Sequence, residues 1–217
     1  MKVKITIFDL ETTSENPVQA EILTGYFHTI IFDLKEQTYE FVDELSVRAK
    51  PDKYLFEAFG IHGISKDEAA TFPAKRDALR EICKFAKKHA DGFFLCHAAS
   101  GFYGHDGYYD WLVIMNQLMQ LSNEAYFWAQ INLRVKVIST HTIAKKLLKQ
   151  RSNGLKELSI QFNLGHFEHH NEVKDVMQTL KLFLRLIDGM TYLSPEDLYD
   201  LGHYSGEKSW QPGLRLI

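Results

Sequence analysis

Cysteine is scarce in this chain: it occurs twice, at Cys83 and Cys96, and not in a Cys-x-x-Cys arrangement. Two isolated thiols support neither a disulfide framework nor a zinc site of the usual kind. The first residues also lack the apolar segment, followed by small residues, that a secretory signal requires. We therefore expect a protein of the reducing cytoplasm.

Long apolar runs and an excess of positive charge are also missing. No stretch approaches the length of a transmembrane helix, so we expect no membrane partner. The chain has 25 Lys and Arg against 28 Asp and Glu, a net charge of −3. This balance excludes the globally basic surface that would by itself indicate nucleic-acid binding. A nucleic-acid partner would have to be bound locally or through metal ions.

The composition is that of one compact globular domain. Of the 217 residues, 45% are hydrophobic and 24% are charged. This length is sufficient for a substantial core.

Two acidic residues end the first predicted strand. The sequence from residue 2 to residue 8, KVKITIF, alternates polar with apolar side chains, which is the periodicity of a strand. Asp9 and Glu11 share the parity of Ile5 and Ile7, so both carboxylates would lie on the inward face. The pattern is compatible with a strand that runs into an acidic turn. It is also compatible with half of a divalent-metal site, because two adjacent carboxylates raise each other's pKa unless a cation lies between them.

Further strands and helices follow from the periodicity of the later chain. The strands are expected at residues 21–34, 39–47, 92–97 and 134–139. The helices are expected at residues 73–90, with Pro73 as the first helical residue, and at 108–121, 124–133, 141–149, 154–162 and 173–189. A last helix begins at Ser194-Pro195. This order predicts an α/β domain in which helices flank a mixed sheet.

Two later acids and a histidine are candidates for chemistry. Asp110 begins an otherwise apolar helix, where it could bind a metal or simply stabilise the helix dipole. Asp175 lies near the start of the last long helix, and by itself it would be an ordinary surface acid. His170 precedes that helix and carries an imidazole that can take up a proton near neutral pH.

Several separated motifs together resemble one family. FDLETT at 8–13, IHGIS at 61–65, YDWLVI at 109–114 and HNEVKD at 170–175 occur in the order found in the DEDD exonucleases of the histidine type (DEDDh), which include the DnaQ-like 3′-5′ exonucleases. The stretch 140–164 is similar to the family as well. The resemblance covers roughly the first 190 residues. It implies a DEDDh exonuclease domain at 1–190, with a ribonuclease H-like, five-stranded mixed sheet, followed by a C-terminal extension at 191–217.

The resemblance also implies roles for individual residues in a two-metal hydrolysis of the 3′-terminal phosphodiester. Asp9 would bridge two Mg²⁺ or Mn²⁺ ions, and Glu11 and Asp175 would complete the site that activates water. Asp110 would help to bind the second ion. His170 would deprotonate the attacking water.

The chain departs from the family pattern at two of these positions. After His97 a glycine-rich insertion separates the second motif from a suitable aspartate, so that Asp106 competes with Asp110 for the role of ligand. In the last motif His169 competes with His170 for the role of base.

The sequence thus predicts a metal-dependent 3′-5′ exonuclease that acts on single-stranded nucleic acid or 3′ ends, DNA in preference to RNA, and releases nucleoside monophosphates. The alternative is a catalytically weak module that binds single-stranded nucleic acid or a polymerase partner. The apolar residues of the C-terminal extension would either cover the domain or contact a protein partner.

Overall fold

A mixed sheet forms the centre of the protein. The computed structural model describes residues 1–55, 59–98, 108–120, 135–149, 153–165, 171–190 and 192–203. The five-stranded sheet has the order β3-β2-β1-β4-β5, and its strands are β1 (Lys2–Thr12), β2 (Ile22–Asp33), β3 (Thr38–Arg48), β4 (Phe93–Cys96) and β5 (Lys136–Ser139). The first three strands pair in antiparallel fashion, whereas β4 and β5 run parallel to β1. The predicted mixed sheet is therefore confirmed.

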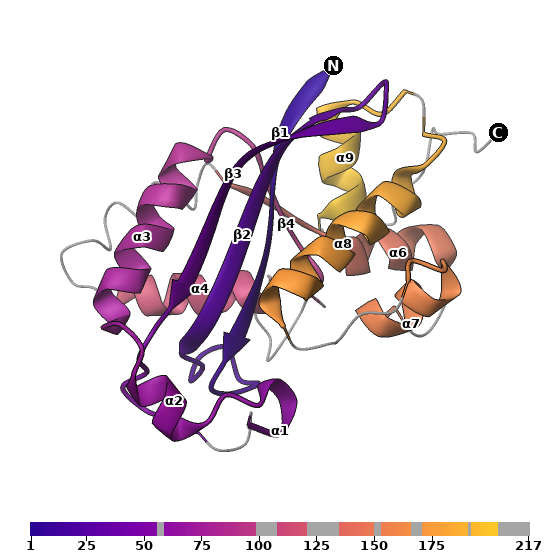
Figure 1. Cartoon of the computed structure of the whole chain (residues 1–217). Helices are drawn as coiled ribbons and strands as arrows, with labels where there is room; N and C mark the ends of the chain where they lie inside the picture. Colours follow the sequence, from indigo (N-terminus) through magenta and orange to yellow (C-terminus); the bar gives the residue numbers. More distant parts are fainter. Residues whose placement is uncertain are drawn as a thin grey trace.

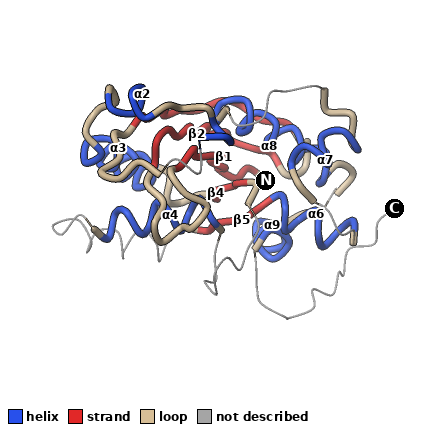
Figure 2. Tube along the Cα trace, turned by 90° about the horizontal axis from the view of Figure 1, so that it is seen from below, coloured by secondary structure: helices blue, strands red, loops and turns tan. Residues whose placement is uncertain are grey.

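Helices cover both faces of this sheet (Figures 1 and 2). The described helices are α1 (Phe59–His62), α2 (Lys66–Ala70), α3 (Lys75–Lys88), α4 (Tyr109–Met119), α6 (Thr140–Leu148), α7 (Leu155–Gln161), α8 (Glu172–Ile187) and α9 (Pro195–Gly202). One core lies between the sheet and α3 and α4, and a second lies between the sheet and α6 to α9. No helix in the described ranges is both long enough and apolar enough to cross a membrane.

The central strand β1 is buried on both faces. Ile5 and Ile7 belong to the core beneath α8, and Phe8 belongs to the core beneath α3 and α4. The alternation in the sequence suggests that only one face is inward, yet Thr6 is also fully buried. Its hydroxyl lies 2.9 Å from that of Thr29 on β2, which satisfies both groups. The face of Ile5 and Ile7 continues to the acids at the end of the strand.

The parallel strands end at one edge of the sheet, which we call the carboxyl edge. Ile7 on β1 is in register with Leu95 on β4, and Leu95 is in register with Ile138 on β5. In Figure 1 this edge lies at the lower end of β1, where α8 begins. Residues that follow the ends of these strands therefore meet residues of the first turn of α8.

The start of α3 differs from the prediction. The helix begins at Lys75 with Ala74 as N-cap, so the prediction that Pro73 is the first helical residue is wrong. The Lys50 N–H donates to the Pro73 carbonyl (2.8 Å), and Lys50 pairs with Ala74 in an isolated bridge. This pairing with the chain beyond β3 keeps the backbone extended for two more residues. The helix predicted at 124–133 lies outside the described residues.

The last described helix, α9, packs onto the domain. Ser194 and Asp197 form a capping box, and Pro195 is in the first turn, as expected for this sequence. Leu198 and Leu201 are fully buried in the core beneath α8. The domain boundary at residue 190 stays a prediction, and residues 204–217 lie outside the described ranges.

Candidate active site

The end of β1 supplies two carboxylates to the carboxyl edge. Asp9 and Glu11 stand opposite Tyr26 and Thr24 on β2, on the face covered by α8. Glu11 is buried, with 6% of its surface exposed, and Asp9 is half-buried. The backbone at both acids is paired with β2, whereas the pairing of β1 with β4 ends at Ile7, before them.

The first turn of α8 brings Asp175 to these two acids. Asn171 caps the helix, its side chain accepting from the Lys174 N–H at 3.1 Å. Val176 and Leu180 pack into the same core as Ile7, which fixes the rotation of the helix. Asp175 is 4% exposed, in contrast to the surface position that it would have as an ordinary helix acid. Carboxylate oxygens of Asp9, Glu11 and Asp175 all lie within 4.8 Å of one another.

Asp110 approaches the same cluster from α4. It lies in the first turn of the helix and is 6% exposed, and the neighbouring Trp111 and Ile114 pack into the core beneath α3 and α4. Burial raises the pKa of Asp110 to about 7, and Asp175 adds to that rise. Asp110 in turn raises the pKa of Asp9, so the two carboxylates belong to one electrostatic unit.

The pKa values of Asp9 and Glu11 are also raised. Burial, and then the carboxylates of Asp110 and Glu11, raise the pKa of Asp9 well above its ordinary range. Burial, and then Asp175 and Glu172, raise the pKa of Glu11 to about 8. Among the described residues, no basic side chain forms an ion pair with Asp9, Glu11 or Asp110. Asp9, Glu11 and Asp110 thus receive no neutralising cation from the parts of the chain that the structure describes.

Glu172 is a fifth acid that the sequence analysis did not include. It lies at the start of α8, half-buried, and its charge raises the pKa of both Asp9 and Glu11. The spacing of three residues between Glu172 and Asp175 places the two on one side of a helix, which was the signal available in the sequence.

Tyr109, the residue before Asp110, connects α4 to the chain that follows β1. Its hydroxyl donates to the Ser14 carbonyl, and it lies 2.7 Å from the hydroxyl of Thr12, where either group can be the donor. Further along α4, Asn116 donates to the Pro17 carbonyl at 3.0 Å. The helix that carries Asp110 is thus bonded to the segment that carries Glu11. Tyr108 is buried, and its hydroxyl donates to the Gly202 carbonyl at 2.6 Å.

Several predicted residues are not among those that the structure describes. The candidate base His170, its rival His169 and the rival ligand Asp106 all lie outside the described ranges. The structure brings Asp9, Glu11 and Asp175 together and links Asp110 to them electrostatically. The catalytic and metal-binding roles of these residues stay predictions.

Comparisons with known proteins point to one group. A family model described as Exonuclease (RNase T) matches residues 6–183. The chain is 26% identical over 212 residues to the PolC-type DNA polymerase III of Thermotoga petrophila, an alignment that covers 93% of this chain and 14% of the polymerase. This chain therefore spans a small part of the length of that curated relative.

Two solved structures illustrate the similarity of the fold. E. coli exonuclease I, in complex with a dT13 oligonucleotide, has a TM-score of 0.64 at 17% identity, over 86% of this chain and 41% of that chain. A 3′-exonuclease solved with a histone mRNA stem-loop has a TM-score of 0.61 at 17% identity, over 85% of this chain and 81% of that chain. At such identities the likeness establishes the ribonuclease H-like fold and no more.

Proposed function

Because this chain belongs to the Exonuclease (RNase T) family, we propose that it is a metal-dependent 3′-5′ exonuclease that releases nucleoside monophosphates. Family membership, within the DEDD exonucleases, confirms the resemblance predicted from the sequence motifs and makes nucleic acid the substrate class. The observation that supports the chemistry best is the meeting of Asp9, Glu11 and Asp175, whose carboxylate oxygens lie within 4.8 Å of one another.

The donor set fits hard divalent cations. All its donors are carboxylate oxygens, which Mg²⁺ and Mn²⁺ prefer, and no Cys lies among them. A carboxyl group whose pKa is raised by burial and by like charges recovers its ionised form when a cation lies beside it. Asp9, Glu11, Asp175 and Asp110 would hold two such ions, which when bound would stabilise the attacking and leaving oxygens of an in-line displacement.

His170 is the general base in this proposal. Its imidazole would take the proton of the attacking water, a role for which a pKa near neutrality is suited. In the sequence it directly precedes Asn171, the N-cap of α8, and it therefore stands close in the chain to Asp175 in the first turn. The assignment rests on the resemblance, and His169 is the alternative.

DNA is the proposed substrate in preference to RNA, because the curated relative is a DNA polymerase. The similar folds have been solved with both kinds of nucleic acid, a dT13 oligonucleotide and an mRNA stem-loop. A preference would depend on contacts to the 2′-hydroxyl. A reducing cytoplasmic location is also part of this proposal, and Cys83 and Cys96 do not form a disulfide.

The test is a panel of 5′-labelled single-stranded DNA, single-stranded RNA and mismatched duplex ends, each with Mg²⁺, Mn²⁺ or EDTA. We expect a ladder that shortens from the 3′ end, mononucleotide products and no digestion in EDTA, with DNA digested fastest. Asp9→Ala should abolish the digestion, because Asp9 lies at the centre of the cluster. Undiminished activity of Asp9→Ala would contradict the site, and binding without digestion by the wild type would favour the weakly active module.

A further inference from the structure

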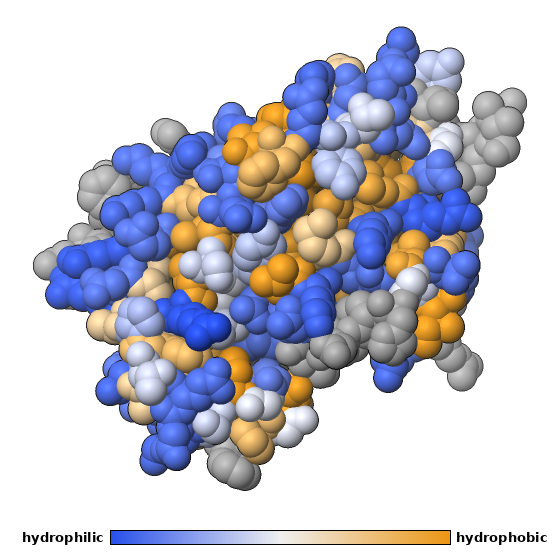
Figure 3. Space-filling view, in the orientation of Figure 1, coloured by the Kyte–Doolittle hydropathy of each residue, from blue (hydrophilic) through white to orange (hydrophobic). Residues whose placement is uncertain are grey.

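Positive charge is concentrated where β3 ends and α3 begins. We call this region the cationic surface, and it consists of Arg48, Lys50, Lys53, Lys75 and Arg76. The hydrogen bond from the Lys50 N–H to the Pro73 carbonyl (2.8 Å) brings its two segments together. In Figure 3 the corresponding part of the molecule, at the lower left, is largely hydrophilic.

A cavity of about 570 Å³ opens within this surface, lined by Lys50, Pro51, Asp52, Ala74, Lys75 and Arg76. The acids there are Asp52 in the lining, Glu21 beside Lys75 and Asp77 in the first turn of α3. The five cations outnumber these acids in a protein whose net charge is −3. The local excess thus has the opposite sign to the charge of the whole chain.

Two of the cations are fixed in place by their neighbours. The Lys75 ammonium is 3.2 Å from the Glu21 carboxylate, with both side chains largely buried, and it also donates to Asp52. The Arg48 guanidinium lies 5.3 Å from the centre of the Phe72 ring, a cation–π contact. These contacts fix the positions of the Lys75 and Arg48 side chains within the cationic surface.

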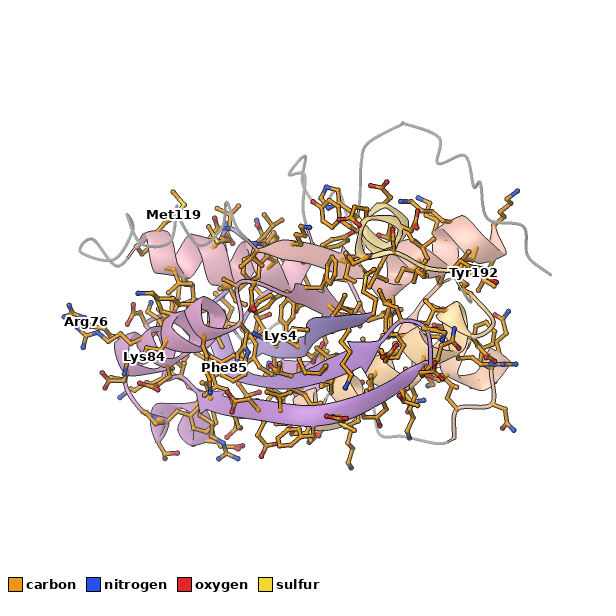
Figure 4. All side chains as sticks on the ribbon, turned by 90° about the horizontal axis from the view of Figure 1, so that it is seen from above. Lys4, Arg76, Lys84, Phe85, Met119 and Tyr192 are labelled. Atoms are coloured by element: carbon orange, nitrogen blue, oxygen red, sulfur yellow. The ribbon has the colours of Figure 1, made fainter. Side chains whose placement is uncertain are left out.

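The other cations point to solvent. Lys50 and Arg76 are exposed, and within the described ranges neither forms an ion pair. Figure 4 shows Arg76 projecting away from the body of the protein. Both side chains are therefore available to an external anion.

The cationic surface is continuous with the carboxylate cluster. Glu11 on β1, Thr24 on β2 and Arg48 on β3 are in register, so that they form one cross-strand row. With strands roughly 4.8 Å apart, the Cα atoms of Glu11 and Arg48 are on the order of 10 Å apart. In addition, the Glu21 carbonyl accepts from the Thr13 N–H at 2.9 Å, two residues beyond Glu11. A strand whose 3′ end lies at the carboxylates could reach the cationic surface within a few nucleotides.

We propose that the cationic surface binds backbone phosphates of the substrate strand, on the 5′ side of the nucleotide being removed. This inference rests on the proposed exonuclease function. Contacts of this kind act through charge and release counterions, so they raise affinity without regard to base sequence. They would also explain how an acidic protein binds a polyanion when the metal site alone contacts only its end.

The test compares the double variant Lys50→Gln/Arg76→Gln with the wild type on a single-stranded 12-mer and on a dinucleotide too short to span the distance. We expect KM for the 12-mer to rise roughly tenfold at low salt, and the slope of log KM against log salt to fall by about 1.4, at about 0.7 for each lost single-strand contact. The dinucleotide should be cleaved at the wild-type rate. The matched control is Lys2→Gln/Lys35→Gln, which removes the same charge at the opposite edge of the sheet.

The inference would be overturned by an unchanged KM for the 12-mer, by an equal loss on the dinucleotide, or by an equal effect of the control variant. An effect seen only with a duplex carrying a 3′ overhang would also overturn it, because the anion would then be the second strand. If the wild type digests neither substrate, the proposed function fails, but fluorescence anisotropy of a labelled 12-mer without metal still tests the surface. Equal affinities of the double variant and the wild type in that assay would overturn the inference independently.

Discussion

Glu11 illustrates how the candidate site opposes the stability of the fold. Its carboxyl group is buried beside Asp175 and Glu172, and its pKa is raised to about 8. An acid with a raised pKa binds its proton more tightly in the folded state than in the unfolded state. Below the ordinary pKa of a glutamate both states are protonated, and above it only the folded state remains so. The free energy of unfolding therefore falls as the pH rises above the ordinary pKa of a glutamate.

From this sign we expect the metal-free protein to lose stability as the pH rises from about 4.5 to about 8. Thermal melts in EDTA should give a lower Tm at pH 8 than at pH 6, and Glu11→Gln should reduce that difference because it removes one titrating group. Mn²⁺ should raise the Tm more at pH 8, where Glu11 gives up its proton readily, than at pH 6, where the metal must displace that proton. If the Tm of wild type and of Glu11→Gln depended on pH in the same way, the raised pKa of Glu11 would not be the cause of the loss of stability.

Helix α4 contributes to the site through its attachment as well as through Asp110. Tyr109 bonds to the Ser14 carbonyl and the Thr12 hydroxyl, and Asn116 bonds to the Pro17 carbonyl. These bonds connect the helix to the segment directly after Glu11. Burial raises the pKa of Tyr109, so its hydroxyl keeps the proton that it donates. The position of Asp110 relative to Asp9 and Glu11 therefore depends on a connection between two elements.

Tyr109→Phe should loosen this connection while keeping the ring in its place. We expect the Mg²⁺ concentration for half-maximal activity to rise several-fold, with KM for the oligonucleotide within about twofold of wild type, and weaker Mn²⁺ binding by titration calorimetry. The loss of one or two hydrogen bonds costs roughly 0.5–1.5 kcal/mol each, so the fold should persist.

Tyr108→Phe is the matched control, since the Tyr108 hydroxyl donates instead to the carbonyl of Gly202, the last residue of α9. It should lower the Tm by a similar amount and leave the requirement for metal unchanged. A similar metal requirement for Tyr108→Phe and Tyr109→Phe would show that the connection to β1 has no particular role in positioning Asp110.

At the scale of the whole molecule, α9 packs onto the domain although it follows the predicted boundary at residue 190. Leu198 and Leu201 are fully buried, in the same core as Ile138 and Val176. Lys146 on α6 also donates to the His203 carbonyl at 2.9 Å at the end of α9. These contacts give α9 a part in the stability of the fold.

Leu198→Ala should lower the free energy of unfolding by about 2–5 kcal/mol, the range for large-to-small changes in a packed core. Chemical denaturation measures this loss. The control is Ile160→Ala on α7, where 73% of the side chain is exposed and the change should be within about 0.5 kcal/mol. A Leu198→Ala variant as stable as the control would mean that the segment after residue 190 is a dispensable extension.

Most features that the sequence predicts correctly come from patterns within a single strand or helix. Alternation placed Asp9 and Glu11 on the face of Ile5 and Ile7, and the capping signal at Ser194 appears in the structure as a capping box. Both depend on residues within one element, whose geometry follows from the backbone alone. The error at Pro73 arose because its carbonyl pairs with Lys50, a partner outside the helix.

The sequence by itself thus determined the five strands, most of the longer described helices, the pair of acids at the end of β1 and, through its motifs, the family. It did not predict the short helices α1 and α2, which form in a stretch where no element is expected from the sequence. The motifs also implied that Asp175 and Asp110 join this pair, but only the tertiary structure showed how: Asp175 reaches it because α8 begins at the carboxyl edge, and Asp110 is linked to Asp9 from α4. Glu172 comes close to the pair for the same reason as Asp175, and the sequence did not predict it. Proximity between elements depends on how their apolar faces pack, and no local pattern in a single chain carries that information. The same holds for the cationic surface, which arises only where β3 ends beside the start of α3.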